Sequence, residues 1–493
     1  MNYEEIIAKK DTQILELTAS NLDLKHQLEQ LRRLIYGRKS ERFISKVDSG
    51  QLNLFEEGTE VVPETEPEKQ TVTYERTRKP NNHSGRRLLD GCSHLPVEEE
   101  TLDIEHSEND KHIGDEVSEK LAFKPGKLFV KRTIRPKYKR AEDETIVIAP
   151  IQEDPISKCA ADVSLLAHIT VSKFVDHLPE YRIQQIFKRE GVVIPPSTMN
   201  GWVHQLGNYV KLMSNHIKGK ILQSGYVQQD ESTIKVLNSK KQGSHTGYMW
   251  VMASPLLKNV CFEYHPGRGR EGPLETYKDY NGQLQTDAYE VYDIIDARYD
   301  SIEHFHCWAH ARRKFIESAN NDKARSEYAI GQIGLLYYIE RRCRESDYTP
   351  DQRREERKLA KPILESFKEW LDTEAIKVTP GSPIGKAMAY LIKRWNKFTK
   401  YVDYGEVEID NNHIENAIRP LALGRKNYLF AGNHTAAETI GHYYTIFGTC
   451  KAQNVNPYEY MTWFLKNVAS TNINEMEKLS PESFKALGLD HDC

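Results

Sequence analysis

The sequence predicts a multidomain α/β protein, and three observations support this prediction. The chain has 493 residues, which is too many for one hydrophobic core and indicates several domains. Strand-like segments between residues 220 and 310 lie between two regions with helical periodicity. A heptad pattern at the N-terminus adds a further, separate element. We therefore expect a sheet with flanking helices, preceded by a coiled coil.

Composition limits the class of protein. Charged residues make up 28% of the chain and aromatic residues 10%, which is typical of a soluble globular protein. No apolar run approaches the ~18–20 residues of a membrane span, so we expect no membrane partner. The seven cysteines include no C-x-x-C pair, which favours a reducing, cytoplasmic location. The net charge of -4 does not by itself indicate nucleic-acid binding, although basic residues cluster locally, as in residues 127–140.

Residues 1–43 are predicted to form a zipper with a basic end. One polar residue, Asn21, occupies an a-type position, where it would set the register of a parallel dimer. The alternative is an amphipathic helix that packs on its own domain. The apolar residues at a-type and d-type heptad positions are Ile7, Ile14, Leu17, Leu24, Leu28, Leu31 and Ile35.

Three segments follow the zipper. Residues 44–85 are rich in Glu, Pro, Thr and Ser and are predicted to be a flexible linker. Residues 86–150 contain short alternating runs and are predicted to form a small β-rich module. Residues 151–219 have a helical pattern, in which a Gly turn and a Ser/Thr cap separate two helices. This is the outline of a DNA-binding helix-turn-helix, but also of a helical hairpin that merely packs.

The remaining chain is predicted to hold a catalytic domain with an insertion. Residues 220–318 and 401–450 form the domain, and the Arg-rich helical stretch 319–400 interrupts it. A helical tail at 451–493 completes the chain.

Three carboxylates in this domain are candidate site residues. Two of them are predicted to end strand-like runs, Asp230 in YVQQDESTIKV and Asp287 in GQLQTDAYEVYD. Glu415 begins a short helical pattern in IDNNHIENAIRPLALGRKNYLFAG, at 409–432. Asp230 could simply end an edge strand. Carboxylates from two strands and a helix can instead converge at one rim of a sheet.

Two of these carboxylates also have structural interpretations. Asp287 with Glu290, and Asn412 with Glu415, have a capping-box-like spacing at a helix start. Glu415 and Arg419 are also an i,i+4 pair of the kind that supports surface helices.

The combination favours a metal site over the separate structural roles. Mg²⁺ or Mn²⁺ takes oxygen ligands and keeps positions open for water and phosphate. Two such ions, about 3.5–4 Å apart, can activate an attacking oxygen and stabilise the leaving one. Cations nearby would then neutralise DNA phosphates. The candidates are Arg312, Arg313, Arg419, Arg425 and Lys426.

These motifs resemble those of the transposases of the insertion sequence 66 family, bacterial DDE-type enzymes with a ribonuclease H-like catalytic domain. The matching segments are QDEST, LQTDAYEVYD, HCWAHARRKF at 306–315 and DNNHIENAIRPLALGRKNYLFAG at 410–432. The zipper, the GRKSER segment and the helices of 151–219 belong to the resemblance as well, so it covers most of the chain.

The resemblance implies a function. Asp230, Asp287 and Glu415 would be the metal-binding catalytic triad, with two Mg²⁺ or Mn²⁺ ions. The enzyme would cleave the ends of an insertion sequence and join the freed 3′-hydroxyls to target DNA. Its partners would be double-stranded DNA, a second copy held through the zipper in a homodimer or higher oligomer, and accessory proteins of the same element. The location would be the bacterial cytoplasm, at the nucleoid.

One departure concerns zinc. The family usually carries a cysteine-based zinc-finger-like module ahead of the catalytic region, but residues 88–145 contain only Cys92. We therefore expect a β-rich fold without zinc, in which cations of 131–139 still touch DNA. The cluster His304, His306, Cys307 and His310 is expected to serve packing and phosphate positioning.

Two other functions remain open at this point. One is a catalytically inactive DNA-binding or regulatory protein derived from a transposase. The other is a metal-dependent nuclease unrelated to transposition, which would leave the zipper and the helix-turn-helix pattern without a purpose.

Overall fold

The computed structural model describes residues 95–489, apart from 103, 105–110, 125, 142–143, 152 and 238–242. The chain divides into two compact units, Met1–Pro80 and Asn81–Cys493, and the described residues all belong to the second. The predicted zipper, the predicted linker and Cys92 lie outside the described residues.

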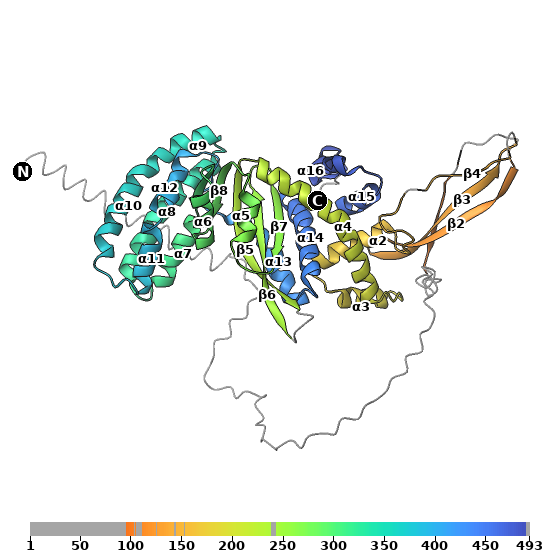
Figure 1. Cartoon of the computed structure of the whole chain (residues 1–493), viewed down its shortest axis with the longest axis horizontal. Helices are drawn as coiled ribbons and strands as arrows, with labels where there is room; N and C mark the ends of the chain where they lie inside the picture. The colour runs from red at the N-terminus through yellow and green to blue at the C-terminus, as the bar shows by residue number, and fades with distance from the viewer. Residues whose placement is uncertain are drawn as a thin grey trace, which may run out of the picture. The chain divides into compact units, whose positions relative to one another are not determined.

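A mixed five-stranded sheet forms the centre of this unit (Figure 1). Its strand order is β7-β6-β5-β8-β9, with β5, β6 and β7 antiparallel and β8 and β9 parallel to β5. Helix α5 (Glu271–Tyr277) precedes β8, and α6 (Glu290–Arg298) connects β8 to β9. The strands are β5 (Tyr226–Leu237), β6 (Ser244–Ser254), β7 (Asn259–His265), β8 (Gly282–Thr286) and β9 (Ile302–His306).

The predicted strands are therefore present, but one structural interpretation of the sequence is wrong. Asp230 lies inside β5, which has β6 on one side and β8 on the other. It does not end an edge strand. The strand has this central place because its first four residues are buried, which suits a strand covered on both faces.

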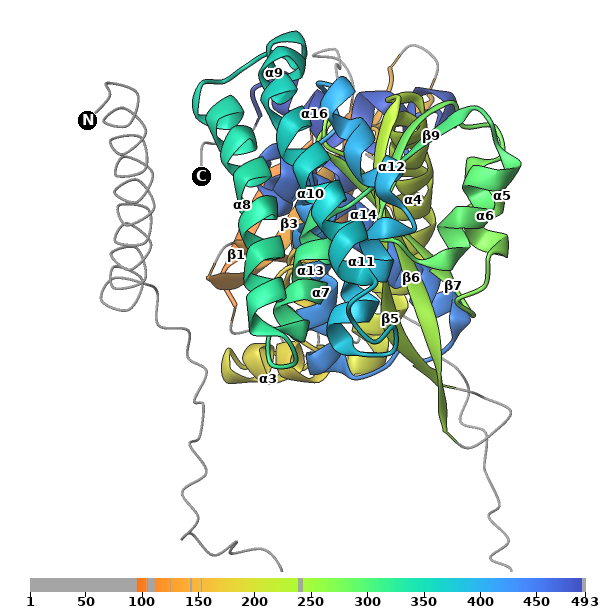
Figure 2. The ribbon, with the colours of Figure 1, turned by 90° about the vertical axis from the view of Figure 1, so that its left-hand side faces the viewer.

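The predicted helical insertion forms a bundle with its own core (Figure 2). Trp308, which follows β9 in the chain, lies in this core, and its Nε1 donates to the Phe398 carbonyl oxygen at 2.7 Å. Glu340 and Arg357 make a fully buried ion pair inside the bundle. The elements are α7 (Trp308–Ser318), α8 (Lys323–Glu345), α9 (Pro350–Glu356), η2 (Arg357–Leu359), α10 (Ala360–Ala375), α11 (Pro383–Ile392), α12 (Trp395–Thr399) and η3 (Lys400–Asp403).

A second sheet precedes the central one, and its cations are paired. The strands are β1 (Val97–Thr101), β2 (Lys111–Lys124), β3 (Lys127–Lys139) and β4 (Ile146–Ile148). The acidic strand β1 runs parallel to β3, so that its glutamates lie opposite the basic residues of β3. Each cation of β3 that was expected to touch DNA contacts a glutamate, which reduces the positive charge left for phosphates. These cations are Lys131, Arg132, Arg135, Lys137 and Lys139.

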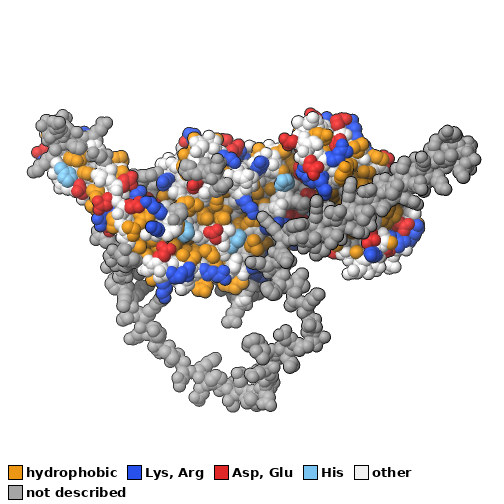
Figure 3. Space-filling view, turned by 180° about the vertical axis from the view of Figure 1, so that it is seen from behind, with side chains coloured by type: hydrophobic (Ala, Val, Ile, Leu, Met, Phe, Trp, Pro, Cys, Tyr) orange, Lys and Arg blue, Asp and Glu red, His pale blue; other side chains and the backbone are white. Residues whose placement is uncertain are grey.

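The predicted helices of 151–219 are α2 (Val163–Phe174), α3 (Glu180–Arg189) and α4 (Pro196–Gln223). One face of α4 is buried along its whole length against α14 and β7, so this helix is part of the central fold. Exposed cations lie on α3. Figure 3 shows the molecule from behind, with left and right exchanged relative to Figure 1. Lys and Arg side chains form a row at its lower edge, in the region where Figure 1 places α3.

Helix α14 (His434–Gln453) covers the edge strand β7. The backbone N–H groups of Phe262 and Val260 donate to the hydroxyls of Thr445 and Thr449, at 2.9 and 3.1 Å. A Cβ at Gly441 would lie 2.8 Å from the Phe262 carbonyl oxygen, so glycine permits this close approach. The helix thereby protects an edge that would otherwise expose unpaired backbone groups.

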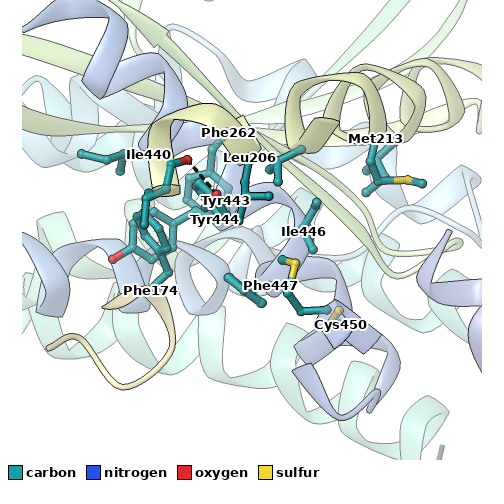
Figure 4. Close-up of a cluster of buried hydrophobic side chains, with 14 of the residues drawn as sticks. Phe174, Leu206, Met213, Phe262, Ile440, Tyr443, Tyr444, Ile446, Phe447 and Cys450 are labelled. Atoms are coloured by element: carbon teal, nitrogen blue, oxygen red, sulfur yellow. Dashed lines mark hydrogen bonds between the residues drawn. The ribbon is translucent and has the colours of Figure 1, made fainter. Parts of the chain in front are cut away.

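The opposite face of α14 packs on α2 and α4 (Figure 4). Tyr443 stacks on Phe174 with a ring separation of 4.4 Å and donates its hydroxyl to the Val203 carbonyl oxygen. Three C-terminal elements complete the fold: α15 (Pro457–Asn467), η4 (Ile473–Leu479) and α16 (Pro481–Ala486).

Candidate active site

Asp230 and Asp287 lie at the same rim of the central sheet. Strand β8 pairs with β5 only as far as Gln228 opposite Gln285. Asp230 comes two residues after Gln228, and Asp287 directly follows Thr286, the last residue of β8. Because β5 and β8 are parallel neighbours, Asp230, two residues beyond the last paired residue of β5, and Asp287, directly beyond β8, lie close together.

Glu415 reaches this rim from α13 (Asn412–Tyr428), which packs across β5. Burial is the main cause that raises the pKa of Asp230, to about 7, and the charge of Asp287 is the next. Glu231 and Glu415 raise this pKa further, whereas the Glu231 N–H, 2.8 Å from Asp230 Oδ1, lowers it. Asp287 and Glu415 therefore lie close enough to Asp230 to affect its charge.

Glu415 contacts the helix α7 rather than its own helix. Arg313 approaches Glu415 Oε1 with a nitrogen at 3.3 Å, and His310 Nε2 lies 3.7 Å from the same oxygen. In the described part of the chain no ion pair joins Glu415 to Arg419, so the i,i+4 surface pair is not formed. The predicted cap is also wrong, because α13 begins after Asn411, which makes no side-chain cap.

The loop that carries Asp287 is fixed by hydrogen bonds on several sides. The Tyr289 N–H donates to Asp287 Oδ1 at 3.0 Å, and the Thr286 hydroxyl donates to the Asp287 carbonyl oxygen at 2.5 Å. The Ala288 N–H donates to the Tyr390 hydroxyl at 3.3 Å. Helix α6 starts only after Tyr289, so the capping box expected from Asp287 and Glu290 is absent.

The insertion supports this loop through a buried histidine. His304 Nε2 lies 2.8 Å from the Thr286 hydroxyl, and His304 Nδ1 lies 3.5 Å from Lys397 Nζ. Burial lowers the pKa of His304 well below its ordinary value, so the ring is neutral. The Thr286 hydroxyl donates its proton to the Asp287 carbonyl oxygen, and Lys397 donates to His304 Nδ1. His304 Nε2 therefore carries the ring proton and donates it to the Thr286 oxygen. His306 lies with its ring 4.6 Å from that of His304, as the strand alternation predicted.

Sequence reasoning missed Glu231, a fourth acidic residue of the site. Its side chain is only 5% exposed and accepts from Arg268 Nε at 2.9 Å. Burial is the main cause that raises the pKa of Glu231. The hydrogen bond from Arg268 lowers this pKa, and the charge of Asp287 raises it. Arg268 also lies over the Tyr289 ring at 3.9 Å, beside Asp287. The adjacent acids of QDEST are the sequence signal that could have found it.

Comparison with known proteins decides the family. A family model described as "Transposase IS66 family" matches residues 158–439, which is more than half of the chain. The chain belongs to the IS66 family of transposases. A second model, described as "Transposase C of IS166 homeodomain", matches residues 23–99.

Two relatives of this IS66 family member come from Sinorhizobium fredii. The chain is 28% identical to the uncharacterized protein y4jD over 495 residues, which cover 96% of each chain. It is also 28% identical to the uncharacterized protein y4qI over 483 residues, covering 93% of this chain and 88% of the relative.

The five cations proposed to bind DNA in this family member differ in their surroundings. Arg312, Arg313, Arg419 and Lys426 are exposed. Arg425 instead donates to the hydroxyls of Ser232 and Thr233 and to the Thr233 carbonyl oxygen, at 2.6–3.1 Å. Its contacts fix α13 to β5.

The site suits a hard divalent cation by its chemistry but requires rearrangement to hold one. Carboxylate oxygens of Asp230, Asp287 and Glu415 are the ligands that Mg²⁺ and Mn²⁺ prefer. The neighbouring carboxylates also contribute to the raised pKa of Asp230, because their negative charges repel one another. A bound cation would relieve this repulsion. Among the described residues, however, no three acidic, histidine or cysteine side chains are close enough together to hold a metal ion. Of the three carboxylates, Glu415 is the one that forms an ion pair, with Arg313.

The helices of the described ranges give no candidate for a membrane span, since none is both long enough and apolar enough.

Proposed function

We propose that the protein is a DNA transposase that binds the ends of an insertion sequence, cleaves them and joins the 3′-hydroxyls to target DNA. The observation that carries the proposal is the arrangement of β5, β8 and α13, which bring Asp230, Asp287 and Glu415 to one rim of the sheet. The raised pKa of Asp230, to which the other two carboxylates contribute, supports it. The family supports a transposase, and the strand order supports a ribonuclease H-like domain with carboxylates on its central strand and the next parallel strand.

In this proposal the three carboxylates hold two Mg²⁺ or Mn²⁺ ions. When bound, such a pair supplies an activated attacking oxygen and stabilises the leaving oxygen of a phosphodiester. The residues of the chain position the reaction. Tyr289 and Thr286 fix the loop of Asp287, and the Glu231 N–H orients Asp230.

Arg313 has two partners in succession in the proposed reaction. It neutralises Glu415 while no cation is bound, and it is exposed on the side where DNA would lie. If Glu415 held a metal ion, the Arg313 guanidinium would be available to pair with a phosphate oxygen. Arg312, Arg419 and Lys426 extend the exposed positive charge along α7 and α13.

The test is strand transfer with purified protein, Mg²⁺ or Mn²⁺, and DNA carrying the two ends of the element. We expect Asp287→Asn and Glu415→Gln to abolish joining while leaving end binding within about twofold, since both changes keep the shape of the side chain. Asp300→Asn, at an exposed position, is the matched control and should join like the wild type.

Two results would contradict the proposal. Full joining by either carboxylate variant would refute the metal assignment. A wild type that binds the ends with every divalent metal but never cleaves would favour the inactive DNA-binding protein instead. The proposed place of action is the bacterial cytoplasm, at the nucleoid, with assembly through the N-terminal zipper.

A further inference from the structure

The turn between α13 and α14 has a strained backbone. Leu429 has φ 66° and ψ -43°, and the Phe430 N–H donates to the Tyr428 carbonyl oxygen at 2.8 Å. This is a γ-turn of the rare form with positive φ, which is costly for a residue with a branched side chain. Strain of this kind persists only where the surroundings enforce it, and it concentrates at functional sites.

The surroundings do enforce this turn. Helix α13 ends at Tyr428, and immediately after the turn Ala431 bridges to β5. The Ala431 N–H donates to the Lys235 carbonyl oxygen at 2.8 Å, and the Leu237 N–H donates to the Ala431 carbonyl oxygen at 2.9 Å. The turn is therefore held between a helix and a strand.

The strained turn presents apolar side chains to solvent. Leu429 is 63% exposed and Phe430 is 45% exposed. Packing in the core explains neither position. A rigid, exposed aromatic ring next to a cavity is the arrangement found where proteins stack on unpaired bases.

A cavity of about 530 Å³ lies beside this ring, between the turn and helices α3 and α4. Its volume is in the range of ligand sites. Phe430 contributes an apolar wall, and Asn200, His204 and Asn427 contribute groups able to hydrogen-bond the edge of a base.

The charge around the cavity selects an anionic occupant. Arg182 lines it and is exposed, and Lys426 is exposed one turn before Phe430. The acidic group of the wall, Glu180, is neutralised by Lys173. A planar apolar group with a negatively charged backbone matches this combination better than an apolar protein segment does.

We propose that this cavity takes a base unstacked from bound double-stranded DNA, with Phe430 as the stacking surface and Arg182 and Lys426 against the flanking phosphates. The proposal rests on the proposed function, because DNA must lie along α13. At 1.5 Å rise per residue, Glu415 and Tyr428 are separated by about 20 Å along the helix, or roughly six base pairs of DNA. The unstacked base is therefore expected about six base pairs from the cleaved bond.

The test compares two duplexes in EDTA, so that no joining occurs. One is fully paired, and the other carries a single bulged 2-aminopurine, whose fluorescence reports stacking. Wild type is expected to bind the bulged duplex about tenfold more tightly, since stacking of a base on an aromatic ring is worth about that much. Phe430→Ala should lose this preference while binding the paired duplex within about twofold of wild type, and Phe430→Trp should restore it.

Ile376→Ala, which removes an 84% exposed apolar side chain of the insertion, is the control and should keep the preference. Equal binding of both duplexes by the wild type, or an unchanged preference in Phe430→Ala, would overturn the base site and leave the turn as a protein-contact surface. Either result is separate from the strand-transfer test, which depends on carboxylates and metal. Failure of the wild type to bind any DNA would overturn the proposed function as well.

Discussion

Replacing Asp230 by Asn should stabilise the metal-free protein, and the gain should depend on pH. The pKa of Asp230 is raised to about 7, first by burial and then by the charge of Asp287. An aspartate in the unfolded chain has a pKa of about 3.9. The folded protein therefore binds this proton more tightly, and the resulting stability is complete below about pH 4 and is lost as the pH rises toward 7.

The size of the effect follows from the shift. About three pKa units at 1.36 kcal/mol each give roughly 4 kcal/mol as an upper limit. Asn has the same shape as Asp and no charge, so the Asp230→Asn variant does not lose this stability as the pH rises. We expect the variant to match the wild type near pH 4 and to exceed it by about 2–4 kcal/mol near pH 8.

The assay is urea unfolding in EDTA at both pH values, with Asp300→Asn as the control at an exposed position. The same pH dependence in wild type and Asp230→Asn would refute the reasoning, because it would show that no buried charge is relieved. Adding Mg²⁺ near pH 8 should stabilise the wild type and have less effect on Asp230→Asn, since bound cations favour ionised carboxylates.

Three further changes test the surrounding fold. Glu340→Gln should lower the free energy of unfolding by about 3–5 kcal/mol, because it leaves the buried charge of Arg357 without a carboxylate partner; Glu355→Gln, in an exposed pair, should leave it nearly unchanged. Gly441→Ala should lower the free energy of unfolding by about 1–3 kcal/mol, because the new Cβ would meet β7. Gly331→Ala, with open space around the new Cβ, should raise it by up to about 1 kcal/mol. Chemical unfolding measures both changes. Tyr390→Phe should slow strand transfer about fivefold without weakening DNA binding, since it removes one hydrogen bond, worth about 1 kcal/mol, from the loop that carries Asp287, a proposed catalytic carboxylate; an unchanged rate would exclude this positioning role.

The elements of the sheet were predictable because their signal is local. The run YVQQDESTIKV lies within β5, Tyr226–Leu237, and the start of the run GQLQTDAYEVYD forms β8, Gly282–Thr286. That Asp230 and Asp287 lie on neighbouring strands could be anticipated from the order of strands along the chain. Each of these inferences needs only a short segment or the sequence of elements.

The partners of the carboxylates could not be predicted, because they depend on contacts between distant segments. The Arg313–Glu415 contact joins residues 102 apart, and nothing in either motif favours it over the local pair with Arg419. Local patterns also suggested caps at Asp287 and Asn412, but the N-cap positions are Tyr289 and Asn411, and neither has a side-chain cap.

The insertion has a role that its position in the sequence does not reveal. It packs its own core, yet it directs Tyr390 to the peptide after Asp287 and Lys397 to His304. His304 in turn contacts Thr286, whose hydroxyl holds the Asp287 carbonyl oxygen. The loop bearing one proposed metal ligand is thus fixed from outside the sheet. A bundle that merely separated two parts of a catalytic domain would have no need for these contacts, so we infer that the insertion sets the geometry of the site.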